Sequence, residues 1–116
     1  MIRSDAEREI GQLFVIGMPG PNMDKETDCL IREDGIGGII LFSRNIEDPL
    51  QLAALCRDLQ TAASKGQGTP LFLAVDQEGG RVARLKEPFT SFPGNAAIGV
   101  DEAPVKRAIE FATGQA

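Results

Sequence analysis

Short apolar segments alternate with amphipathic ones along this chain, and this alternation constrains the fold more than any other feature. Residues 13–16, 37–42 and 71–75 are apolar or glycine throughout. The run at 37–42 is typical of a strand buried on both faces of a parallel sheet, the run at 13–16 indicates a buried strand, and the run at 71–75 indicates a third apolar strand. Helical patterns separate these segments, as in βαβ units. We therefore expect an α/β fold with a parallel sheet and right-handed crossovers.

Polar start signals and glycine stop signals delimit the expected helices. Ser4 and Glu7 have the spacing of a capping box, Gly35 can end a helix, and Asp48 with Pro49 forms an N-cap and first-turn pair. The helices expected from these signals and from apolar periodicity cover residues 5–11, 24–34, 49–64 and 101–113.

The expected order is a helix followed by three strand–helix pairs. Three parallel strands with helices on one side do not enclose a core, because the other face of the sheet needs a cover as well. We therefore expect residues 1–116 to form one partial domain of a larger fold.

The composition excludes several functional classes. The net charge is −5 and no basic stretch is present, so nucleic-acid binding is not expected. No apolar run approaches the ~20 residues that a membrane span requires. The first ten residues are charged and lack the apolar core of a secretory signal, which makes the cytoplasm the expected location.

Histidine is absent, which removes the commonest general base and the commonest metal ligand. Cys29 and Cys56 lack CxxC spacing, and we expect two free thiols of the kind found in cores. The sequence therefore predicts neither a metal site nor a cofactor.

Asp76 follows the third expected strand directly. In parallel α/β folds the loops at this end of the strands form the ligand-binding rim, where a carboxylate can accept hydrogen bonds from two sugar hydroxyls. Arg81 and Arg84 follow closely and supply donors for ligand oxygens. An alternative interpretation has Asp76 capping a following helix, with both arginines solvated.

Asp76 and Glu78 have the spacing of a carboxylate pair on one face of a strand. In a retaining glycosidase the two catalytic carboxylates lie about 5–5.5 Å apart. Gly79 and Gly80 follow at once, however, so the backbone turns there and the pair need not converge. We expect Glu78 to brace the turn or to pair with an arginine.

Ser43, Arg44 and Asn45 follow the second expected strand and lie on the same rim as Asp76. They are either walls of a pocket or ordinary polar loop residues. The sequence favours the loop interpretation slightly and leaves both open.

The segments GGIILFSRNIEDPLQL, PLFLAVDQEGGRVARL and FPGNAAIG carry a family resemblance. From about Ile10 to Ala116 the chain resembles glycoside hydrolase family 3, in its β-N-acetylhexosaminidase branch. The resemblance implies the N-terminal portion of a TIM (β/α)8 barrel. It also implies retaining hydrolysis of terminal β-linked N-acetylglucosamine, in cell-wall or chitin-fragment recycling.

By the same resemblance, Asp76 binds hydroxyls of the terminal sugar and Arg84 lines that subsite, whereas no ligand role is carried over to Arg81. The catalytic elements of the family, a Lys-His pair, an Asp-His acid/base element and an aspartate nucleophile, have no counterpart in these residues. The resemblance therefore implies a carbohydrate-binding portion that is inactive alone and has the remaining barrel as its partner. The alternatives are a non-catalytic sugar-binding or assembly module, and a fragment of a family 3 β-glucosidase.

Overall fold

A computed structural model describes residues 4–115, with the side chain of residue 115 left undescribed. The chain divides into two compact units, Met1–Val75 and Asp76–Ala116. Each unit is described by itself below.

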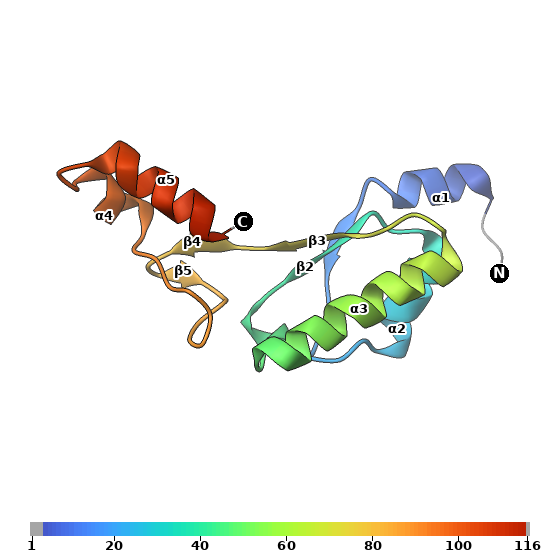
Figure 1. Ribbon diagram of the computed structural model, residues 1–116. Coiled ribbons are helices and arrows are strands. Elements are labelled where there is room, and N and C mark those ends of the chain that lie inside the picture. Colours follow the sequence, from blue (N-terminus) through green and yellow to red (C-terminus); the bar gives the residue numbers. More distant parts are fainter. Residues whose placement is uncertain (1–3, 116) are drawn as a thin grey trace. The chain divides into compact units, whose positions relative to one another are not determined.

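The first unit contains a three-stranded parallel sheet in the order β1–β2–β3 (Figure 1). The strands are β1 (Val15–Gly17), β2 (Gly38–Leu41) and β3 (Phe72–Val75). Ile16, Ile39 and Leu73 lie side by side in register across the three strands. The predicted α/β class, the parallel pairing and the strand order in the chain are thus confirmed.

The helices of this unit begin at capping residues, of which Ser4 and Asp48 were predicted as caps and Asp24 was expected as the first helical residue. Ser4 caps α1 (Asp5–Gly11) through a capping box, Asp24 caps α2 (Lys25–Cys29), and Asp48 caps α3 (Pro49–Gly66). Instead of one helix over 24–34, α2 continues as a π-helical segment, η1 (Leu30–Asp34), which ends at Gly35 with φ 70°. No helix in the described part of the chain is long and apolar enough to cross a membrane.

The core of the unit lies between one face of the sheet and the helices α3 and η1. Ile39 and Leu41 of β2 meet Leu55 and Leu59 of α3 there, and Ile31 of η1 is wholly buried in the same cluster. Cys29 and Cys56 are free, half-buried thiols, and Cys56 packs against this core.

The opposite face of the sheet is open. Val15 and Phe72 lie in register with Gly38 on this face, and the two side chains are 52% and 78% exposed. The expectation of a buried strand at residues 13–16 is therefore wrong for β1 within the described residues. The side-chain pattern fixes which residues share a face, whereas burial depends on what covers that face.

Hydrogen bonds hold α1 against the loops that precede β2 and β3. The Nη2 atom of Arg8 donates to the carbonyl oxygens of Arg32 and Gly66, at 2.8 and 3.0 Å. The side-chain amide of Gln12 donates to Gly35 O at 2.6 Å and to Gln67 Oε1 at 3.1 Å. These bonds satisfy carbonyls at the ends of η1 and α3 that no helical bond reaches.

The second unit opens with a small antiparallel hairpin of β4 (Gln77–Gly79) and β5 (Val82–Ala83). Two helices follow, α4 (Asn95–Gly99) and α5 (Pro104–Gln115). The sequence predicted α5 with shifted bounds and missed the hairpin and α4. The apolar side chains of Val105 and Ile109 in α5 are 74% and 62% exposed.

Candidate functional site

Asp76 occupies the position after β3, as the sequence predicts. Its side chain is exposed and makes no hydrogen bond or ion pair with any residue in the range 4–115. The next element is the strand β4, so the alternative in which Asp76 caps a helix is wrong. The carboxylate is therefore available to accept hydrogen bonds from a ligand.

The turn of the hairpin depends on two glycines. Gly79 and Gly80 have φ values of 79° and 58°, in the left-handed region that other residues rarely adopt. A Cβ atom on Gly79 would lie 2.6 Å from the carbonyl oxygen of Pro93, and Gly80 N donates to Phe92 O at 3.2 Å. Close packing against residues 92–94 thus explains this glycine pair, and it confirms that the backbone turns directly after Glu78.

The side chain of Gln77 holds the strand that leads to Arg84. Gln77 Oε1 accepts hydrogen bonds from the backbone N–H groups of Arg84 at 2.8 Å and Leu85 at 3.0 Å. Gln77 Nε2 donates to Leu85 O at 3.0 Å. Arg84 is half-buried and its Nε atom is inaccessible to solvent, so this arginine is not the freely solvated side chain of the alternative interpretation.

Glu78 has no bracing contact. It lies in β4, its side chain is exposed, and within the described part of the chain it makes no hydrogen bond or ion pair. The expectation that Glu78 braces the turn or pairs with an arginine is therefore wrong. Gln77 and the close approach of Gly79 to Pro93 hold the turn instead.

The residues after β2 form a short 3-10 helix, η2 (Ser43–Asn45), and have three different environments. Ser43 is exposed. Asn45 is fully buried and bonds Met18 O, Gly20 O and Phe42 N at 3.0, 2.8 and 2.9 Å. Arg44 donates from Nε to Met18 O at 2.9 Å, and its guanidinium lies 4.8 Å from the centroid of the Phe42 ring.

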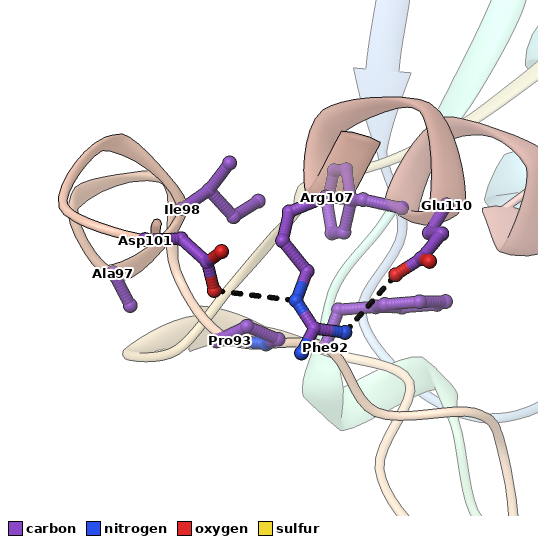
Figure 2. Close-up of a pocket in the computed structure, with 8 residues that line it drawn as sticks. Phe92, Pro93, Ala97, Ile98, Asp101, Arg107 and Glu110 are labelled. Carbon is purple, nitrogen blue, oxygen red and sulfur yellow. Dashed lines mark hydrogen bonds and ion pairs between the residues drawn. The ribbon is translucent and has the colours of Figure 1, made fainter. Parts of the chain in front are cut away.

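A separate hollow of about 440 Å³ lies within the second unit (Figure 2). Phe92 and Phe111 line it, with their rings 5.0 Å apart in an edge-to-face arrangement. Arg107 also faces the hollow and bonds Asp101 at 3.2 Å and Glu110 at 3.0 Å. Since both carboxylates engage this guanidinium, its charge is already balanced locally.

The charged groups of this hollow stabilise one another. The backbone N–H of Ala103, and then the guanidinium of Arg107, lower the pKa of Asp101. The hydrogen bonds that Arg107 donates to the carboxylates of Asp101 and Glu110 raise the pKa of Arg107. The sequence did not single out these residues, although Arg107 and Glu110 are three positions apart on α5 and Asp101 lies in the turn just before that helix.

Comparisons with known proteins agree with this fold. Residues 6–114 match the "Glycosyl hydrolase family 3 N terminal domain". A β-N-acetylglucosaminidase of glycoside hydrolase family 3 from Paenibacillus sp. str. FPU-7 superposes with a TM-score of 0.79 at 40% identity, covering 84% of this chain and 18% of that one. A β-N-acetylhexosaminidase from Beutenbergia cavernae gives 0.73 at 28% identity, over 88% of this chain and 31% of that one.

Similar sequences point the same way. A beta-hexosaminidase A from Pseudoalteromonas piscicida is 50% identical over 76 residues, which are 64% of this chain and 13% of the relative. A beta-hexosaminidase from Photobacterium profundum is 46% identical over 80 residues, which are 69% of this chain and 23% of the relative. The chain thus spans less than a quarter of the length of either relative.

A parallel sheet whose strands are connected by helices is the arrangement of the N-terminal portion of a TIM barrel. The chain belongs to the family described as the glycosyl hydrolase family 3 N-terminal domain.

Proposed function

We propose that this chain supplies the sugar-holding portion of a retaining β-N-acetylhexosaminidase. The observation that carries the proposal is the placement of an unengaged carboxylate, Asp76, directly after β3, followed by a hairpin that fixes the backbone of Arg84. Relatives named beta-hexosaminidase, and a structure of NagZ with N-trifluoroacetyl-D-glucosamine at 33% identity, support N-acetylglucosamine as the terminal sugar.

In this proposal Asp76 binds the sugar as a hydrogen-bond acceptor and Arg84 binds it as a hydrogen-bond donor. The Asp76 carboxylate accepts hydrogen bonds from two neighbouring hydroxyl groups, which an ionised carboxylate does strongly. Arg84 donates to oxygens of the same sugar. Both act by positioning the substrate, which is how residues outside the bond-breaking chemistry contribute to catalysis.

The bond-breaking groups lie outside residues 1–116 in this proposal. Retaining hydrolysis needs one carboxylate as nucleophile and a second group as acid and base. The sequence has no histidine and Glu78 points to no partner, so the chain alone is expected to be inactive. Recycling of cell-wall or chitin fragments in the cytoplasm is the cellular setting we propose with this activity.

The proposal is tested by binding and by turnover. Asp76→Asn and Arg84→Met are expected to remove or strongly weaken N-acetylglucosamine binding, whereas Arg81→Met is expected to leave it unchanged. Turnover of a nitrophenyl β-N-acetylglucosaminide by the purified 116-residue chain would contradict the inactive-alone part of the proposal. If the Asp76 and Arg84 variants bind N-acetylglucosamine as tightly as the unmodified chain does, the proposed sugar-binding roles of these two residues are wrong.

A further inference from the structure

Arg44 is the one residue of the η2 turn whose role the fold does not explain. The buried side chain of Asn45 links the carboxyl ends of β1 and β2 by hydrogen bonds. Ser43 is exposed. Arg44 is exposed as well, yet its guanidinium is held in one place. An arginine that only solubilises a loop does not need this arrangement.

Two contacts fix the guanidinium of Arg44. Its Nε atom donates to Met18 O at 2.9 Å, and the guanidinium carbon lies 4.8 Å from the centroid of the Phe42 ring. Met18 O is itself fixed, because buried Asn45 donates to it at 3.0 Å. The guanidinium is thereby pre-organised, and little side-chain freedom remains to be lost when a ligand binds.

Gly17 makes room for this guanidinium on the open face of the sheet. A Cβ atom on Gly17 would lie 3.1 Å from Arg44 Nη2 and 3.4 Å from the Phe42 ring. Gly17 points to the same face as Val15, opposite the face that the helices cover. The guanidinium of Arg44 therefore lies at the carboxyl ends of β1 and β2, on the face of the sheet that α3 and η1 do not cover.

The outer nitrogen atoms of Arg44 remain available. Nε is engaged, but within the described residues neither Nη atom makes a hydrogen bond or an ion pair. Arg57 on α3 offers a contrast, because its Nη2 atom pairs with the adjacent Asp58 at 3.3 Å and its side chain is 72% exposed. Two parallel N–H donors in a rigid plane match two neighbouring oxygen atoms of one ligand.

We propose that Arg44 is a sugar-binding residue of the first unit, which donates hydrogen bonds to two neighbouring oxygen atoms of a sugar. The proposal rests on the glycosidase function proposed above. The oxygen pair belongs either to adjacent hydroxyls of a neutral sugar such as N-acetylglucosamine or to the carboxylate of an acidic sugar. Arg44 touches the substrate and takes no part in proton transfer, because an arginine stays protonated.

The experiment follows arginine side-chain Nε–H resonances of the isotope-labelled 116-residue chain by NMR. N-acetylglucosamine and D-glucuronate are titrated separately to millimolar concentrations, with sodium chloride as the control for ionic strength. The backbone amides of Asp76 and Arg84 are recorded in the same spectra. We expect the Arg44 signal to shift and saturate with at least one sugar, and the responding sugar identifies the source of the oxygen pair.

Two variants sharpen the test. Arg44→Lys keeps the charge but loses the planar fork, and is expected to weaken binding of the responding sugar about tenfold. Arg57→Lys is the matched control and is expected to bind as the unmodified chain does. Backbone amide spectra of both variants report directly whether the fold is retained.

The outcomes separate the two proposals. Shifts at Asp76 and Arg84 without one at Arg44, and with equal binding by Arg44→Lys, overturn the role of Arg44 and leave the proposed function intact. A response of Arg44 that sodium chloride reproduces also overturns it. Silence of all three residues with both sugars overturns both proposals.

Discussion

The side-chain amide of Gln77 accepts the hydrogen bond that the backbone N–H of Arg84 would otherwise donate to a neighbouring strand. Its Oε1 atom accepts the Arg84 N–H at 2.8 Å, directly after a hairpin whose paired strands are only three and two residues long. Such short strands cannot hold a side chain in place by ladder hydrogen bonds alone. The position of Arg84 therefore depends on Gln77, which itself touches no ligand in the proposed site.

Replacing Gln77 by alanine is expected to loosen residues 84 and 85 without unfolding the chain. Each lost hydrogen bond contributes about 1 kcal/mol, which corresponds to a roughly fivefold loss of protection. Hydrogen exchange at the Arg84 and Leu85 amides measures this loss.

Gln60→Ala is the matched control for that experiment. Gln60 clamps Leu71 in the same way, with Oε1 accepting from Leu71 N at 3.0 Å and Nε2 donating to Leu71 O at 2.9 Å. Its loss should expose the Leu71 amide and leave Arg84 protected. Unchanged exchange at Arg84 in the Gln77 variant contradicts the clamp.

The parts of the fold that follow from local chemistry were predictable from the sequence. The caps at Ser4 and Asp48 and the helix stop at Gly35 each depend on one residue type at one place, and all three are confirmed. The hairpin after Asp76 was not predicted, because strands of two or three residues with a glycine show no alternation to detect.

Only those parts of the candidate site that depend on the order of strands and loops along the chain were predictable from the sequence. Asp76 at the end of β3 follows from the apolar run before it, whereas the Gln77 clamp and the fixed guanidinium of Arg44 depend on contacts between loops. Sugar binding by Asp76 and Arg84 stays a prediction. The exposed faces of β3 and α5 show the same limit, because apolar periodicity identifies a face but not its cover.

Asn45→Ala is expected to destabilise the first unit by about 2–4 kcal/mol, since each buried polar group left without a partner costs about 1–3 kcal/mol. The variant removes three hydrogen bonds, to Met18 O, Gly20 O and Phe42 N. Urea denaturation followed by circular dichroism measures the change. Ser43→Ala, at the exposed neighbouring position, should change stability by less than about 0.5 kcal/mol. Equal stability of the two variants contradicts a structural role for Asn45.

Gly66→Ala is expected to destabilise the chain although it places alanine at the end of a helix. Alanine normally stabilises a helix over glycine by about 0.5–1 kcal/mol. Here a Cβ atom would lie 2.5 Å from Arg32 Cα, and the resulting displacement costs about 1–3 kcal/mol and disturbs the bonds from Arg8. The melting temperature should fall for Gly66→Ala. It should stay level or rise for Gly99→Ala, where no atom lies within 4 Å of the added methyl group.

The thiols of Cys29 and Cys56 are expected to react slowly with alkylating agents. Glu33 raises the pKa of Cys29 but not that of Cys56. Burial raises the pKa of both Cys29 and Cys56, and the negative charge and hydrogen bond of Glu33 raise the pKa of Cys29 further. A raised pKa means less thiolate at a given pH, so the iodoacetamide rate should keep increasing above pH ~8.5, the ordinary thiol pKa. Mass spectrometry of each cysteine peptide as a function of pH measures both profiles.

Glu33→Gln removes a charge that disfavours the Cys29 thiolate. The pKa of Cys29 should therefore fall, and its alkylation profile should move to lower pH while staying above that of the chain unfolded in urea, because burial still acts on the thiol. Cys56, whose pKa is raised by burial alone, serves as the internal control and should keep its profile in the same sample. If the alkylation profiles of both cysteines move together, the substitution has loosened the fold rather than removed a local charge. If the profile of Cys29 does not move, Glu33 does not contribute to the raised pKa of that thiol.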